Sequence, residues 1–143
     1  HNDFDVLDLK TKTINGFDYE FKHASDDFLP TITTIINNYE ILVFITPVYW
    51  YSMSGILKNF LDRFSDLLHY KKDLGRKLRG KKLAMVSNSG TDDLKDGFTM
   101  PFIASANYLG MQYLGDTHAW FSKNEITKDA KQKLDNFREM ITP

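Results

Sequence analysis

The most constraining feature of this sequence is an unbroken run of five apolar residues, 41–45 (I-L-V-F-I), which ends at Thr46-Pro47. A run of this kind is typical of a β-strand covered on both faces, because a half-exposed strand would alternate apolar and polar residues. A second such run, residues 83–86 (L-A-M-V), precedes the polar stretch S-N-S-G-T. The two runs predict buried strands of a parallel sheet with helices on both of its faces.

Amphipathic helices are predicted between and after these strands. Apolar residues recur at helical spacing in residues 28–39, 56–68, 102–109 and 130–141, with start signals at Ser54-Gly55, Pro101 and Thr127 and an end signal at Gly110. Residues 4–9 (F-D-V-L-D-L) and 111–120 are predicted to be two further strands, the latter at a sheet edge. Strand and helix then alternate four times, which predicts an α/β fold with right-handed crossovers.

Composition narrows the function classes. The 143 residues fit one domain, and a hydrophobic fraction of 42% is enough for a core. A net charge of -1 argues against nucleic acid as a partner. The absence of cysteine excludes disulfides, thiolate nucleophiles, thiolate-bound zinc and cysteine-held iron–sulfur clusters. No apolar run is long enough to cross a bilayer and no signal peptide is visible, so we expect a cytoplasmic protein without a membrane partner.

Two loops follow the carboxyl ends of the two clearest strands, where ligands bind in open α/β sheets. The first contains three consecutive aromatic residues, Tyr49, Trp50 and Tyr51. Their flat faces suit stacking on a planar heterocycle, and the loop N–H groups suit its carbonyl oxygens and ring nitrogens. A dimer contact or a plug of the core explains the same three rings equally well, and the pattern alone favours neither interpretation.

The sequence T-P-V-Y-W-Y-S-M-S-G-I-L-K-N-F-L-D-R, from Thr46 to Arg63, resembles the signature of NAD(P)H-dependent FMN reductases and related flavodoxin-like quinone reductases, and the strand at residues 40–45 fits as well. The resemblance implies a flavodoxin-like three-layer α/β/α sandwich with a parallel sheet. It also implies an FMN cofactor and NAD(P)H as co-substrate. The residues that it places at the flavin ring are Pro47, Val48, Tyr49, Trp50, Tyr51, Ser52, Asn88, Ser89, Gly90 and Thr91.

The sequence departs from the family at its start. Such proteins begin with a central strand and a phosphate-binding loop at a helix N-terminus, and nothing before Phe4 matches them. Residues 4–9 match the family's second strand. The expectation is a single flavodoxin-like domain over residues 1–143 without its first strand, in which either that segment lies outside this sequence or the strands pair differently. FMN binding is expected to be poor without the phosphate loop.

The resemblance implies an oxidoreductase that transfers a hydride from NAD(P)H to flavin and on to flavin, a quinone or a similar small acceptor. The protein needs no acid or base for this chemistry, so no catalytic residue is assigned, and no metal is expected. The rival hypothesis is a flavin-free flavodoxin-like interaction module, and flavin absorption would discriminate the two. The family resemblance, together with the apolar side chains of Tyr49, Trp50, Met53 and Ile56, predicts a homodimer or homotetramer.

Three other sequence patterns are weaker evidence for a function. Residues 92–96 (D-D-L-K-D) look like a magnesium motif, but a solvated loop is the favoured interpretation. The segment 71–82 holds seven Lys and Arg residues, which could attract the phosphates of NADPH or another anion, although a solvated connector is favoured. His118 could line a substrate pocket, but a lone histidine is more often structural.

Overall fold

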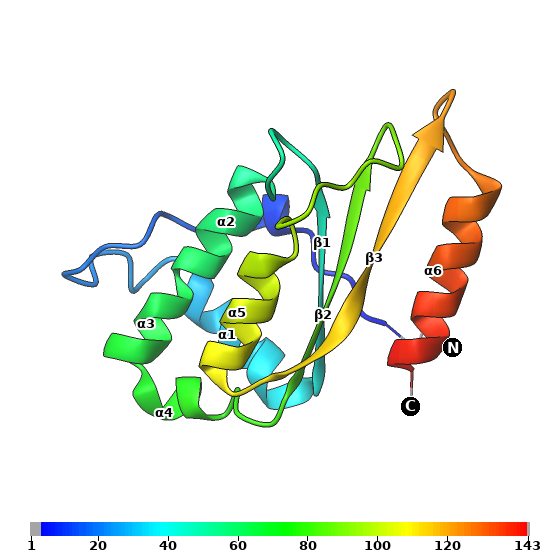
Figure 1. Ribbon diagram of the computed structural model, residues 1–143. Coiled ribbons are helices and arrows are strands. Elements are labelled where there is room, and N and C mark those ends of the chain that lie inside the picture. The colour runs from blue at the N-terminus through cyan, green and yellow to red at the C-terminus, as the bar shows by residue number, and fades with distance from the viewer. Residues whose placement is uncertain (1–3, 143) are drawn as a thin grey trace.

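A computed structural model describes residues 4–142 and shows three layers around a mainly parallel sheet (Figure 1). The strands β1 (Ile41–Pro47), β2 (Lys82–Ser89) and β3 (Gln112–Ser122) are parallel and lie in the order β1-β2-β3. The two-residue strand β4 (Glu125–Ile126) folds back antiparallel on the end of β3. The predicted α/β architecture with buried parallel strands is confirmed.

Helices cover the two faces of the sheet unequally (Figure 1). The larger layer begins with a short 3-10 helix, η1 (Leu9–Thr11), and continues with α1 (Phe28–Asn38), α2 (Gly55–Asp62), α3 (Phe64–His69), α4 (Lys72–Arg76) and α5 (Met100–Leu109). On the opposite face lies α6 (Lys128–Ile141), which packs mainly against β3. The sheet therefore has one thickly covered face and one face with a single described helix.

The alternation of side chains along each strand explains this arrangement. Leu42 and Phe44 of β1 and Met85 of β2 point into the main core with α1, α2, α3 and α5. Val43 and Ala84 point to the other face, where α6 contributes Phe137 and Ile141. The next residue on that face of β1, Ile45, is 64% exposed, so α6 leaves the outer end of β1 uncovered.

The helix ends follow the predicted signals. The Ser54 hydroxyl accepts from the Leu57 N–H at the start of α2, and the Thr127 hydroxyl accepts from the Ala130 N–H at the start of α6. Gly110 ends α5 with φ +71°, a left-handed conformation that glycine adopts without strain. Within residues 4–142, no helix is long and apolar enough to span a bilayer.

The predicted strand at residues 4–9 is wrong. Residues 4–8 have no regular structure, and Leu9 already belongs to η1, because the Asp8 carboxylate accepts from the Lys10 N–H and caps that turn. A strand needs a partner, and β1 ends the strand order of the described residues on this side. Val6 is consequently 88% exposed.

The region after β1 is also more divided than the periodicity predicted. The single helix expected over residues 56–68 is two helices, α2 and α3, which meet at Arg63. The expected connector at residues 70–82 contains the short helix α4. Gly75 makes this possible, because a Cβ there would lie 2.4 Å from the backbone oxygen of Leu67 in α3.

Arg63 is buried to 1% exposure and ties the long segment before α1 to the junction of α2 and α3. Its guanidinium donates to the carboxylates of Asp26 at 2.5 Å and Asp66 at 2.8 Å. It also donates to the backbone oxygens of Asn15 and His23 and lies 4.7 Å from the centre of the Phe28 ring. A buried cation is tolerable only with such partners.

Burial acts to raise the pKa of Asp26, but the hydrogen bond from Arg63 and the backbone N–H groups of Asn15 and Phe28 outweigh it. The pKa therefore lies below its ordinary value of 3.8. A carboxyl whose pKa is lowered by folding adds stability above its unfolded pKa and loses that contribution as the pH falls through its folded pKa.

Asp26→Asn should lower the free energy of unfolding by about 2–3 kcal/mol at neutral pH, since Arg63 would lose one of its two carboxylates. The difference from the parent chain should begin to shrink below about pH 4, near the pKa of Asp26 in the unfolded chain, and should be lost as the pH falls through the lower pKa of the folded state. Urea unfolding at several pH values measures both. The control is Asp62→Asn, which removes an exposed pair with Lys58 and should cost under about 0.5 kcal/mol. Equal effects of the two variants would contradict the role given to Asp26.

Candidate functional site

The aromatic loop after β1 closes in a tight turn. The Tyr49 N–H donates to the Ser52 oxygen at 2.9 Å, and the Ser52 N–H donates back to the Tyr49 oxygen at 3.0 Å. Between them, Trp50 has φ +50° and Tyr51 has φ +64°. Positive φ at both central residues is the backbone of a type I′ hairpin turn, which normally selects asparagine and glycine.

Large aromatic residues in this turn are strained, at a cost of about 1–3 kcal/mol for each left-handed residue. Their rings do not repay that cost by burial, because Tyr49, Trp50 and Tyr51 are 61%, 94% and 69% exposed. The interpretation of these rings as a core plug is therefore wrong. Strain held in an exposed turn is the kind of feature that marks a binding site.

Buried residues hold the base of this turn. Thr46 is fully buried, and its hydroxyl accepts from the Ser54 N–H at 2.9 Å, which joins the end of β1 to the start of α2. Met53 is also buried, at 7% exposure, so it does not add to the exposed apolar surface as the sequence suggested. The turn is thus a strained, exposed segment that is flanked by buried residues.

The second loop lies directly beside the first. Pro47 is in register with Asn88, and the Val48 N–H donates to the Asn88 oxygen at 2.9 Å. This continues the β1–β2 pairing one residue beyond the strand end. Because β1 and β2 are neighbours, the two loops that follow them lie side by side at the carboxyl edge of the sheet.

His118 of β3 is only 7% exposed and makes hydrogen bonds to the second loop. Its Nε2 lies 3.0 Å from the Thr91 carbonyl oxygen and 3.1 Å from the Ser89 hydroxyl, and its Nδ1 lies 2.8 Å from the hydroxyl of Ser87. A carbonyl oxygen only accepts, so Nε2 carries the proton, and in the neutral ring Nδ1 accepts from Ser87. Both ring nitrogens are engaged with the protein, which agrees with a structural histidine.

Contacts continue from His118 through Trp120 to α6. The ring of His118 stacks on Trp120, with centroids 6.4 Å apart. The Lys133 ammonium lies 4.5 Å from the centre of the Trp120 ring and 3.3 Å from the carboxylate of Asp92. Asp92 is therefore held by a cation of the protein, and Asp93 pairs with Lys95. Within residues 4–142, His, Asp and Glu side chains form no group that could hold a metal ion.

All ten residues predicted for the site lie at this carboxyl edge: Pro47, Asn88 and Ser89 at the ends of β1 and β2, and the other seven in the two adjoining loops. The four half-buried ones are Pro47, Val48, Asn88 and Ser89. The six exposed ones are Tyr49, Trp50, Tyr51, Ser52, Gly90 and Thr91. Sequence reasoning missed the supporting roles of Thr46, Ser87 and His118. No local pattern reveals them, because each acts through a residue of another element.

The loops offer what a planar, carbonyl-bearing ring requires. Three aromatic faces are accessible, and the N–H groups of Trp50, Tyr51 and Gly90 have no hydrogen-bond acceptor among residues 4–142. Such donors suit the carbonyl oxygens and ring nitrogens of a flavin. The residues present therefore fit the ring portion of FMN.

The fold is that of a flavodoxin-like α/β protein, and the carboxyl edge of its sheet presents three exposed aromatic rings. The family profile described as NADPH-dependent FMN reductase matches residues 1–125, and the chain belongs to this family. It is accordingly an NAD(P)H-dependent oxidoreductase with FMN as its cofactor.

Individual relatives agree with this membership. A putative NAD(P)H-dependent FMN-containing oxidoreductase of Bacillus subtilis (strain 168) is 28% identical over 131 residues, covering 75% of this chain and 72% of the relative. An uncharacterized NAD(P)H oxidoreductase of the same organism is 30% identical over 121 residues, covering 71% and 67%. The structure titled Trp repressor binding protein from Bacillus subtilis matches with a TM-score of 0.69 at 23% identity, covering 85% of this chain and 83% of that one, which shows the fold.

His118→Ala should lower the free energy of unfolding by about 1–3 kcal/mol, because the buried Ser87 hydroxyl loses its partner and the Thr91 oxygen keeps only the Ser89 hydroxyl as a donor. Amide hydrogen exchange of the loop after β2 should speed up more than that of β1. His69→Ala, at an exposed position of α3, is the matched control and should be close to neutral. Unchanged exchange in the loop would show that His118 does not hold it.

Proposed function

We propose that this chain binds the FMN ring between the turn at residues 47–52 and the loop at residues 88–91, and that flavin, a quinone or a similar small acceptor takes the electrons. The observation that carries the proposal is the strained turn, whose three rings are exposed and whose base is hydrogen-bonded to the second loop. The family membership supports the chemistry, and the geometry of this turn supports the location.

When bound, FMN would supply the redox chemistry, the two-electron transfer from NAD(P)H to the second substrate. The residues of this chain would bind the flavin, orient it and shield it from solvent. Trp50 and Tyr51 would provide flat faces for the ring, and their N–H groups would donate to its polar edge. His118 of β3 keeps Ser89 and Thr91 in place by hydrogen bonds. A cytoplasmic location is part of this proposal, in keeping with NAD(P)H as the reductant.

The direct test is a titration of the purified chain with FMN, followed by NADH and NADPH oxidation with menadione as the acceptor. Saturable quenching of flavin fluorescence and acceptor-dependent oxidation of the reduced nicotinamide support the proposal. A chain that binds FMN without oxidising either nicotinamide would contradict the activity. The absence of any flavin binding, as opposed to the weak binding expected without the phosphate loop, would favour a flavin-free interaction module.

Trp50→Ala should weaken FMN binding about three- to tenfold, the value of one aromatic stacking contact. It should change the free energy of unfolding by less than about 0.5 kcal/mol, because 94% of the residue is exposed. Tyr19→Ala, which removes another exposed ring far along the chain from both loops, controls for the loss of a surface aromatic. If Trp50→Ala leaves FMN affinity unchanged and collapses the melting temperature, the site assignment is wrong.

The exposed apolar residues of this loop also support a homodimer or homotetramer. Ile56, at the first turn of α2, is 45% exposed and follows the three exposed rings in the chain. A surface of this kind is typical of an interface between subunits. Light scattering at micromolar concentration should give at least twice the mass of one chain, and a monomer with intact secondary structure would defeat this prediction.

A further inference from the structure

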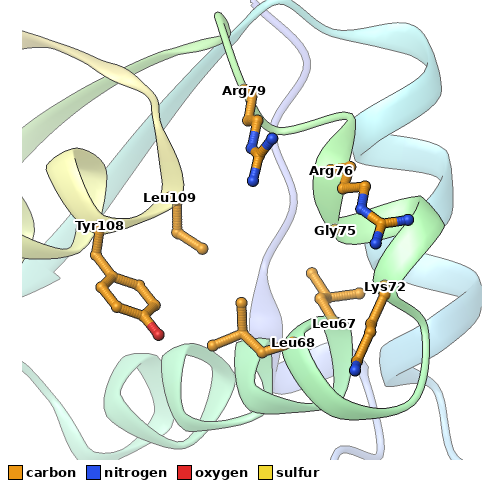
Figure 2. Close-up of a pocket in the computed structure, with 8 residues that line it drawn as sticks. All are labelled: Leu67, Leu68, Lys72, Gly75, Arg76, Arg79, Tyr108 and Leu109. Carbon is orange, nitrogen blue, oxygen red and sulfur yellow. The ribbon is translucent and has the colours of Figure 1, made fainter.

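A concave surface lies among α3, α4 and α5, at the amino edge of the sheet, opposite the two loops (Figure 2). It encloses about 280 Å³, near the lower end of the range for small-molecule pockets. Leu67 and Leu68 of α3 and Leu109 of α5 give it apolar walls. The ring of Tyr108, 77% exposed, stands at the rim.

The polar lining of this cleft is cationic. Lys72, Arg76 and Arg79 contribute to it, and no Asp or Glu does. Arg76 pairs with Asp73, whereas the side chains of Lys72 and Arg79 have no hydrogen-bond or ion-pair partner among residues 4–142. In Figure 2 the Arg79 guanidinium points into the space between Leu109 and Leu68. The basic stretch noted in the sequence therefore has a concave, partly apolar surface beside it.

Two glycines shape the cleft. Gly75 lets α4 approach α3, because a side chain there would collide with the backbone of Leu67. At Gly110, a Cβ would stand 3.1 Å from Cγ of Arg79, so the stem of this arginine rests against bare backbone. The guanidinium is thereby directed by packing of its own stem, which reduces the freedom that a surface arginine would otherwise have.

The cleft is far from the aromatic turn. Arg79 precedes β2 and Leu109 precedes β3, whereas the two loops follow the opposite ends of β1 and β2. The eight residues of β2 span about 25 Å, so one small ligand cannot touch both places.

We propose that this cleft is a second binding site, for a small organic anion with an apolar body of about one ring. The anionic group would meet Arg79 and Lys72, and the apolar body would lie on Leu67, Leu68 and Leu109. Arginine binds carboxylate, sulfonate and phosphate oxygens with paired donors, and the leucines add a preference that bare inorganic anions cannot satisfy. The site does not depend on FMN.

Fluorine NMR titration of the chain with para-trifluoromethylbenzoate tests the proposal. Binding should be saturable and at least about fivefold tighter than binding of the uncharged para-trifluoromethylbenzamide. Inorganic phosphate at equal concentration should not displace the benzoate. Displacement by phosphate would mean a site for anions alone, and equal binding of benzamide would mean an apolar surface alone. Either result overturns the proposal, as does a response that never saturates.

Three variants test whether the benzoate binds in this cleft. Arg79→Gln should weaken benzoate binding about fivefold, and Lys71→Gln, which removes one positive charge from the same segment outside the cleft lining, should change it by less than about twofold. Leu68→Trp should abolish binding by filling the cleft, and circular dichroism verifies that each variant is folded. Equal losses from Arg79→Gln and Lys71→Gln would reveal general attraction to a basic surface and overturn the assignment.

Discussion

The ion pairs and hydrogen bonds of the buried Arg63 guanidinium are the interactions on which the rest of this structure depends. It joins the segment before α1, through Asp26 and two backbone oxygens, to the junction of α2 and α3. A buried charge without these partners would cost several kcal/mol, so the segment, the two helices and the Phe28 ring are organised around one ion. Asp26 also accepts from the Phe28 N–H, so the ion pair holds the start of α1.

The turn at residues 49–52 is strained. Its positive φ values at Trp50 and Tyr51 persist only when both ends of the turn are held. Thr46 and the capped start of α2 hold one side, and the hydrogen bond from Val48 to Asn88 holds the other. Behind Asn88, His118 ties down the second loop. The candidate flavin site is thus a pair of exposed loop tips on a framework of buried hydrogen bonds.

The two edges of the sheet carry different chemistry. The carboxyl edge presents exposed aromatic rings and free N–H donors, which suit a planar neutral ring. The amino edge presents Lys72 and Arg79 over apolar walls, which suit an anion with an apolar body. A net charge of -1 conceals this separation, because six of the 18 Lys and Arg residues lie in the short segment between α3 and β2. Distribution, more than total charge, decides which ligands a surface attracts.

The sequence by itself determined the buried strands β1 and β2, the capped starts of α2 and α6, and the family, because these depend on local runs, on cap residues and on the stretch from Thr46 to Arg63. It misassigned residues 4–9, since an apolar, alternating segment becomes a strand only beside a partner. Only the tertiary structure decided that Arg63 is buried, that His118 serves the loop after β2, and that basic residues flank a cleft. Each of these depends on side chains far apart in the chain, and no local pattern records which distant groups will satisfy a charge or a hydrogen bond.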